Sequence, residues 1–301
     1  MYERVPALTL FLLVLPGVIC AGVALVVAAG ALYGAWIKPQ EGMDQDQARL
    51  FHGVRASLPR RAWGLCVEVW YQILSLILRT LHSFRALPAL ECDAGCVPVL
   101  VLPGFTENAG TMWWLARRLA RAGFYPVLVD FPSTLHRIEQ NVEFLRLFIS
   151  SLRAKVGGEP IPVVAHSMGG LITRTLIHSH ADHGVRTLVA IASPFRGTRL
   201  ARIGTRLGLR GHCLGQMIPG SEFMQRFPPS LPCDVPILSL IALQENIVVP
   251  EWSAVVADAE VRVLERPWGH QTPLFAGEVY QQVEAWLLNY GVTRRSIDSM
   301  A

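Results

Sequence analysis

The feature that most restricts the fold is a regular alternation of short apolar runs with helix-length amphipathic segments between residues 97 and 290. This alternation is typical of a parallel β-sheet covered by helices, and it predicts an α/β fold. The interval 195–232 breaks the pattern and is predicted to be an inserted cap or lid. The expected strands cover 97–104, 124–132, the run that begins at 162, 186–194, 234–243 and 261–265, and the expected helices cover 111–122, 136–154, the segment that ends near His180, and 276–290.

One serine stands at a turn between a predicted strand and a predicted helix. The residues are Ala165-His166-Ser167-Met168-Gly169-Gly170, and they follow an apolar run. A serine on such a sharp turn exposes its hydroxyl above the sheet, and the small residues beside it let strand and helix cross closely. Ala165 stands where the G-x-S-x-G pattern has its first glycine. Ser167 is therefore the candidate nucleophile.

A serine hydroxyl needs a base to remove its proton, and the base needs an orienting acid. Among the histidines after Ser167, His270 alone follows the last predicted strand, in a loop that can return to the sheet. The run 234–243 leads directly into Glu245, which is the best candidate for the acid, with Glu251 in reserve. The order serine, acid, histidine is the one found in α/β-hydrolases.

Negative charge on a substrate carbonyl needs backbone N–H donors. The predicted donors are the amide of Met168, directly after the nucleophile, and that of Phe105 in the loop after the first strand. Trp113 and Trp114 follow this loop. They are predicted either to wall an apolar acyl pocket or to pack in the core of a helix, and the sequence leaves both interpretations open.

Several segments in this order resemble bacterial lipases and esterases of the α/β-hydrolase superfamily. They are LPGFTENAGTMWWLARRLARAGFYPVLVDFP, AHSMGGLITR, IASPFRGT, QMIPGSEFMQRF, ENIVVPEWSA and GHQTPLF, and the likeness covers about residues 97–290. The resemblance implies hydrolysis of acyl esters through an acyl-serine, with Ser167 as nucleophile, His270 as base and Glu245 as the acid. It departs from the usual pattern at Ala165, and at Glu245, where these enzymes usually carry aspartate.

The predicted function is therefore hydrolysis of lipid or other apolar carboxylic esters, without a cofactor. A thioesterase or acyltransferase on the same fold is one alternative, and a catalytically silent lipid-binding protein is another. No metal site is predicted, because neither the cysteines nor His178, His180 and His183 have the spacing of one. A net charge of +4 and the absence of any nucleic-acid motif give no reason to expect a nucleic-acid partner.

The chain is 51% hydrophobic, and much of this excess lies in residues 5–37, which carry no charge. About 20 apolar residues suffice to cross a bilayer, whereas a cleaved signal peptide has a shorter apolar core of about 7–15. A retained single-pass anchor is therefore predicted over 1–37. Basic residues are more frequent after this segment than before it, which favours a cytoplasmic C-terminal side, but long domains often translocate regardless, so the side stays open.

Residues 38–96 are predicted to be a linker with an amphipathic helix, and 97–301 the α/β-hydrolase domain. Glu68 and Arg79 interrupt the apolar stretch 62–84, so this stretch is a poor spanning helix. It is predicted either to pack on the domain or to lie in a membrane interface.

Two smaller predictions concern cysteines and arginines. Cys92 with Cys96, and Cys213 with Cys233, are spaced so that each pair can bridge in an oxidising compartment. Five arginines recur every three or four residues in the inserted region and form one basic face if that segment is helical. This face suits either anionic headgroups or plain solvent. They are Arg196, Arg199, Arg202, Arg206 and Arg210.

Overall fold

The computed structural model describes residues 49–51, 57–90, 97–208 and 212–294. The predicted anchor over 1–37, together with Cys92 and Cys96, lies outside the described residues. Six strands form one sheet in the order β2-β1-β3-β4-β5-β6, and every neighbouring pair is parallel. The strands are β1 (Pro98–Leu102), β2 (Tyr125–Leu128), β3 (Ile161–His166), β4 (Val185–Ile191), β5 (Ile237–Ile241) and β6 (Ala259–Val263).

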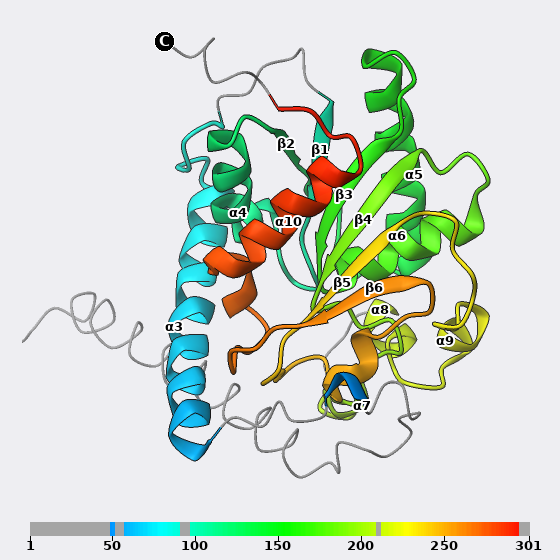
Figure 1. The fold of residues 1–301 in the computed structure, drawn as a ribbon. Coiled ribbons are helices and arrows are strands. Elements are labelled where there is room, and N and C mark those ends of the chain that lie inside the picture. Colours follow the sequence, from blue (N-terminus) through cyan, green and yellow to red (C-terminus); the bar gives the residue numbers. More distant parts are fainter. Residues whose placement is uncertain (1–48, 52–56, 91–96, 209–211, 295–301) are drawn as a thin grey trace, which may run out of the picture.

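Helices cover both faces of this sheet (Figure 1). Each predicted helix of the alternation is present, and the strands form the parallel sheet that the alternation predicts. The α-helices are α3 (Leu58–Ser83), α4 (Ala109–Arg121), α5 (Ile138–Lys155), α6 (Met168–Ser179), α7 (Arg199–Arg206), α8 (His212–Gln216), α9 (Glu222–Arg226) and α10 (Gly277–Asn289), and the 3-10 helices are η1 (Glu251–Ala254) and η2 (Thr272–Phe275).

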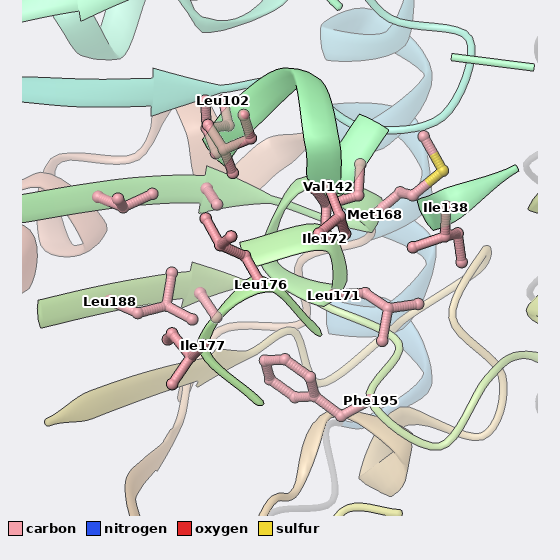
Figure 2. Packing of buried hydrophobic residues seen from close by; sticks show 14 of the residues in the cluster. Leu102, Ile138, Val142, Met168, Leu171, Ile172, Leu176, Ile177, Leu188 and Phe195 are labelled. Atoms are coloured by element: carbon pink, nitrogen blue, oxygen red, sulfur yellow. The ribbon is translucent and has the colours of Figure 1, made fainter. Parts of the chain in front are cut away.

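The core has two layers because side chains alternate between the two faces of each strand. On β1, Leu100 and Leu102 join the cluster with α5 and α6, whereas Val99 and Val101 join the cluster with α4 and α10. Figure 2 shows part of the first cluster, in which Ile172 of α6 lies beside Val142 of α5, with Leu102 and Leu188 on the strands nearby. The two apolar layers hold the strand ends, and therefore the loops after them, in fixed positions.

The inserted region 195–232 contains three short helices, α7, α8 and α9. Apolar side chains of this region, including Phe195, Met217 and Phe223, belong to the same buried cluster as α6. The region is thus packed onto the domain in this structure, and its role as a cap or lid stays a prediction.

The basic face in this region is shorter than the sequence predicted. Arg199, Arg202 and Arg206 lie on α7, which ends at Arg206. The guanidinium of Arg196 lies in the preceding loop, 5.7 Å from the ring centroid of Trp252, and Arg210 falls outside the described residues.

The bridge that the spacing of Cys213 and Cys233 left open is not formed in this structure. Both thiols are free: Cys213 donates to the carbonyl of Thr134, and Cys233 donates to that of Val235. Burial raises the pKa of Cys213 to about 11. Spacing in the sequence suggested a pair, but the local backbone satisfies each thiol separately.

Candidate active site

Ser167 lies in a strained backbone turn between β3 and α6. Its φ of 50° and ψ of −122° fall in a region that residues with a side chain rarely adopt. Its own N–H donates to the carbonyl of Ile191 at the end of β4, at 2.8 Å, which fixes the turn against the neighbouring strand. The side chain is almost buried, with 6% of the residue exposed. This is the conformation that the sequence predicted for a nucleophilic serine.

Small residues let three segments meet at this turn. A Cβ on Gly104 would lie 2.9 Å from the Cβ of Ser167, and one on Gly169 would lie 2.7 Å from the carbonyl oxygen of Pro103. A Cβ on Gly170 would lie 2.1 Å from the hydroxyl of Ser193. The loop that carries Phe105 therefore lies directly beside Ser167. The fully buried Ala165 fits between Leu102 and Ala190 of the neighbouring strands, so the departure from glycine is accommodated.

The structure brings His270 and Glu245 together, as the sequence predicted. The Nδ1 atom of His270 is 3.0 Å from Oε2 of Glu245, and the other carboxylate oxygen accepts the N–H groups of Asn246 and Ile247 at 2.9 Å each. The side chain of Asn246 accepts the N–H of His270, which ties the two loops to each other. Glu251, the reserve candidate, lies at the start of η1.

His270 and Glu245 shift each other's pKa toward the charged form of each side chain. Burial acts to raise the pKa of Glu245, but the facing His270 and the backbone N–H groups outweigh it and hold the pKa below its ordinary value. Burial acts to lower the pKa of His270, but the carboxylate of Glu245, assisted by Glu107 and Glu68, raises it above its ordinary value. Burial also raises the pKa of Glu251. The carboxyl oriented on the imidazole is thus the one whose pKa is lowered, whereas that of Glu251 is raised.

A second buried carboxylate, Glu107, lies beside these residues. One of its oxygens accepts the N–H of Gly104 at 2.6 Å and lies 2.9 Å from Nδ1 of His166, and the other accepts the side-chain amide of Gln271. The ring of His166 packs against that of His270 with 4.6 Å between centroids, and its Nε2 lies 3.1 Å from the His270 carbonyl. This network joins the loop beside Ser167 to the loop of His270.

We expect this carboxylate to make stability depend on pH in acid. Although burial acts to raise it, the pKa of Glu107 is lowered to about 2 from 4.5, by His166, Gln271 and the N–H of Gly104. A lowered pKa contributes stability that is present above pH 4.5 and is lost as the pH falls toward 2. Between these values, the free energy of unfolding should therefore fall more steeply for the wild type than for Glu107→Gln. Denaturant titrations at each pH test this, and parallel slopes would contradict it.

The structure also places the two residues predicted to stabilise the negative oxygen and the two predicted pocket tryptophans. Met168 is the first residue of α6, and Phe105 is half-buried against the first core cluster. Trp113 is buried in the second cluster, and its indole N–H donates to the carbonyl of Pro88, whereas Trp114 is 39% exposed. The position of Trp113 agrees with core packing, and a substrate contact by either tryptophan stays a prediction.

Helix α3 contacts three of the loops that carry candidate residues, those of His270, Glu245 and Phe105. The buried Glu68 accepts the N–H groups of Gln271 and Thr272 at 2.8 and 3.0 Å, and the hydroxyl of Thr272 at 2.7 Å. The side chain of Gln244 donates to the carbonyl of Arg61, and Arg79 donates to that of Thr106. The helix therefore packs on the domain, which was one of the two predicted arrangements.

The sequence interpretation missed Glu68, Glu107, His166 and Gln271. Each carried a weak signal. Glu68 is the single charge in residues 62–78, and Glu107 is the single charge in the loop PGFTENAG. His166 directly precedes the nucleophile, and Gln271 directly follows His270. Their partners lie far away in the chain, so the signals gave no roles.

Several known proteins match part of this chain. The family described as Serine aminopeptidase, S33 (Hydrolase_4) matches residues 97–236. A lysosomal thioesterase, PPT2-B of Xenopus laevis, is 27% identical over 120 residues, which are 37% of this chain and 42% of the relative. Cutinase 1 of Thermobifida cellulosilytica is 28% identical over 92 residues, 28% of this chain and 35% of the relative. The chain thus spans less than half of the length of these relatives.

Solved structures share the fold at low identity. Lipase B of Aspergillus fumigatus superposes with a TM-score of 0.53 at 20% identity, covering 66% of this chain and 55% of that one. The mature lipase BlEst2 of Bacillus licheniformis also gives 0.53, at 16% identity, covering 67% of this chain and 95% of that one. The chain therefore shares its fold with these lipases. In sequence it is similar, over part of its length, to the S33 family, a thioesterase and a cutinase.

Proposed function

We propose that the chain is a serine hydrolase that cleaves apolar carboxylic esters through an acyl-serine intermediate. The observation that carries this proposal is the buried His270–Glu245 pair, whose imidazole packs against His166, the residue directly before a serine held in a strained strand-to-helix turn. The residues proposed as catalytic are Ser167, His270 and Glu245. The similarity to lipases and a cutinase supports an ester as substrate.

The proposed reaction uses each group in turn. With its Nδ1–H directed at Glu245, His270 has Nε2 free to take the proton of the Ser167 hydroxyl as the oxygen attacks the ester carbonyl. The amides of Met168 and Phe105 stabilise the negative oxygen that forms. The protonated His270 then passes its proton to the leaving alcohol. Water, activated by the same imidazole, hydrolyses the acyl-serine and releases the acid.

The proposal includes a position at a membrane. Residues 5–37 are long and apolar enough to form a retained anchor, which would hold the domain near lipid esters. Among the residues that the structure describes, α3 is the one helix long and apolar enough to cross a bilayer, and it packs along the domain instead. We therefore assign the anchor to the N-terminal segment.

A thioesterase is the second candidate function, because two matched relatives carry that name. The lysosomal thioesterase homologue of Drosophila melanogaster is 25% identical over 131 residues, beside the Xenopus protein already described. The same triad can cleave an ester bond and a thioester bond, since the carbonyls of both pass through the same kind of negatively charged intermediate. Parallel assays with p-nitrophenyl esters and acyl-CoA thioesters of matched chain length distinguish the two functions.

The decisive test is covalent labelling of full-length protein with a fluorophosphonate probe. We expect labelling of the wild type and none of Ser167→Ala, because the probe reacts with an activated serine hydroxyl. Ser179→Ala is the matched control, since Ser179 is an exposed serine at the other end of α6. A wild type without label would overturn both hydrolase functions and favour a silent lipid-binding protein. A label that persists in Ser167→Ala would overturn the assignment of the nucleophile.

A further inference from the structure

An exposed apolar stripe runs along the outer face of α3. Trp63, Trp70 and Ile77 follow each other at intervals of seven residues, which places them on one side of the helix, and Phe84 continues the spacing directly after the helix ends. Their exposed fractions are 54%, 64%, 48% and 80%. Large exposed apolar side chains gathered on one face mark an interaction site, whereas scattered single residues do not.

The composition of α3 does not match its burial. Glu68 is the single charge between residues 62 and 78, yet only 22% of the most apolar 18-residue window is buried in the protein. A core helix with this composition is mostly buried. The outer face of α3 therefore needs an apolar environment that the described part of the chain does not supply.

The inner face of the same helix shows why it does not cross a membrane. A Cβ on Gly64 would lie 2.1 Å from the carbonyl oxygen of Pro267, and one on Gly110 would lie 2.5 Å from that of Leu78. Figure 1 shows α3 lying lengthwise beside α4 at one side of the molecule. A helix packed along its length on one side and exposed on the other has the geometry of a helix that lies in a membrane interface.

An aromatic groove of about 550 Å³ opens beside the stripe, between α3 and η2. Trp63, Trp70, Trp268 and Phe275 line it, and the exposed Arg266 stands among them. Tryptophan is enriched where a membrane meets water, because its ring is apolar and its N–H is polar. The groove gives the apolar face aromatic side walls and one positive charge.

The charges at the ends of α3 favour an anionic surface. Arg60 and Arg61 are exposed at its beginning and Arg85 directly after its end. Each basic side chain near an anionic bilayer contributes about 1 kcal/mol of attraction. The apolar segment 5–37, which precedes α3 by about 20 residues, would keep a bilayer within reach.

We propose that the outer face of α3, with the aromatic groove beside it, lies on the surface of an anionic lipid bilayer. The inner face of the helix meanwhile holds the loops of Glu245, His270 and Phe105. This docking uses the anchor of the proposed function but not its chemistry, and it fixes how the domain is oriented on the membrane.

Quenching of added tryptophans by brominated phospholipids tests this proposal. Full-length protein is placed in vesicles of phosphatidylcholine and phosphatidylglycerol, with or without bromine on the acyl chains near the headgroup. Ile77→Trp adds one tryptophan on the proposed face. Leu147→Trp is the matched control, because Leu147 is 54% exposed on α5, across the sheet from α3 (Figure 1). The wild-type signal is subtracted from both.

We expect the tryptophan added at position 77 to lose at least twice as large a fraction of its fluorescence as the one at 147. Leu81→Trp, on the same face, should behave like Ile77→Trp. Equal weak quenching at all three positions would overturn the proposal, and it is the result expected if a second copy or another segment of this chain covers the stripe. Fluorophosphonate labelling of the same samples reports the proposed chemistry separately, so failure of one proposal is distinguishable from failure of the other.

Discussion

Replacing His270 by alanine in the full-length protein is expected to lower kcat/KM for a soluble p-nitrophenyl ester by about 10⁴-fold. Without the imidazole, no group takes the Ser167 proton, so the hydroxyl stays a poor nucleophile. His136→Ala is the matched control, because His136 is exposed in the loop before α5, and it should keep wild-type activity. Similar rates in the two variants, with both folded by circular dichroism, would contradict the assignment of the base.

The pH profile tests the acid in the same mechanism. His270 acts as a base only when neutral, so activity rises as the pH increases through its pKa. Burial lowers this pKa, but Glu245 outweighs burial and raises it above 6.5. The rise in kcat/KM should therefore lie above pH 6.5 in the wild type and move to lower pH in Glu245→Gln. We also expect Glu245→Gln to lower the plateau rate by about 10³-fold or more.

A matched comparison separates the two carboxylates that the sequence left open. Glu251→Gln replaces the reserve candidate, whose pKa burial raises. We expect this variant to leave the midpoint of the pH profile of kcat/KM in place, because Glu245 still faces Nδ1 of His270. A shift in Glu251→Gln but not in Glu245→Gln would reverse the assignment.

The sequence predicted those parts of the molecule that depend on local pattern. Apolar runs predicted the strands, because a buried parallel strand is apolar on both faces. The turn at Ser167 was recognisable since its constraints, a small residue at 165 and glycines at 169 and 170, lie within six positions. Glu245 and His270 were predicted from their places after late strands, because parallel strands carry their following loops to one edge of the sheet.

Contacts between distant residues were not predictable in the same way. Glu68 and Thr272 are 204 positions apart, and Glu107 and Gln271 are 164 apart. Nothing in either local pattern specifies the partner. The Cys213–Cys233 pair is a further example, since spacing along the chain gives no distance between two sulfur atoms.

In α3, the helical form was predictable from the sequence, whereas its contacts with distant residues were not. Its helical spacing was visible in the sequence, and the two predicted arrangements, packed on the domain or lying in an interface, were treated as alternatives. The structure shows one face packed and the other face exposed and apolar. Glu68, which made the segment a poor spanning helix, is the residue that binds it to the loop of His270.

Replacing Glu68 by leucine is expected to destabilise the domain by about 3 kcal/mol or more. The carboxylate accepts two backbone N–H groups and one hydroxyl at a fully buried position, where only 1% of the residue is exposed. Leucine accepts none of them, and each unsatisfied buried donor costs about 1–3 kcal/mol. For a domain of this size, the loss lowers Tm by about 6–12 °C. Thermal unfolding of both proteins in one detergent measures the difference.

Gln72→Leu and Glu68→Gln show whether the carboxylate itself holds the catalytic loop. Gln72 lies one turn away on α3, is half-buried and binds Glu68, so its replacement removes one hydrogen bond and should lower Tm far less. Glu68→Gln keeps one acceptor but turns an amide NH₂ toward the donors of the loop. Its Tm should therefore lie between those of Glu68→Leu and Gln72→Leu. Because those donors directly follow His270, the loss of kcat/KM should follow the same order. Equal Tm values for Glu68→Leu and Gln72→Leu would show that apolar packing, and not Glu68, attaches α3 to the site.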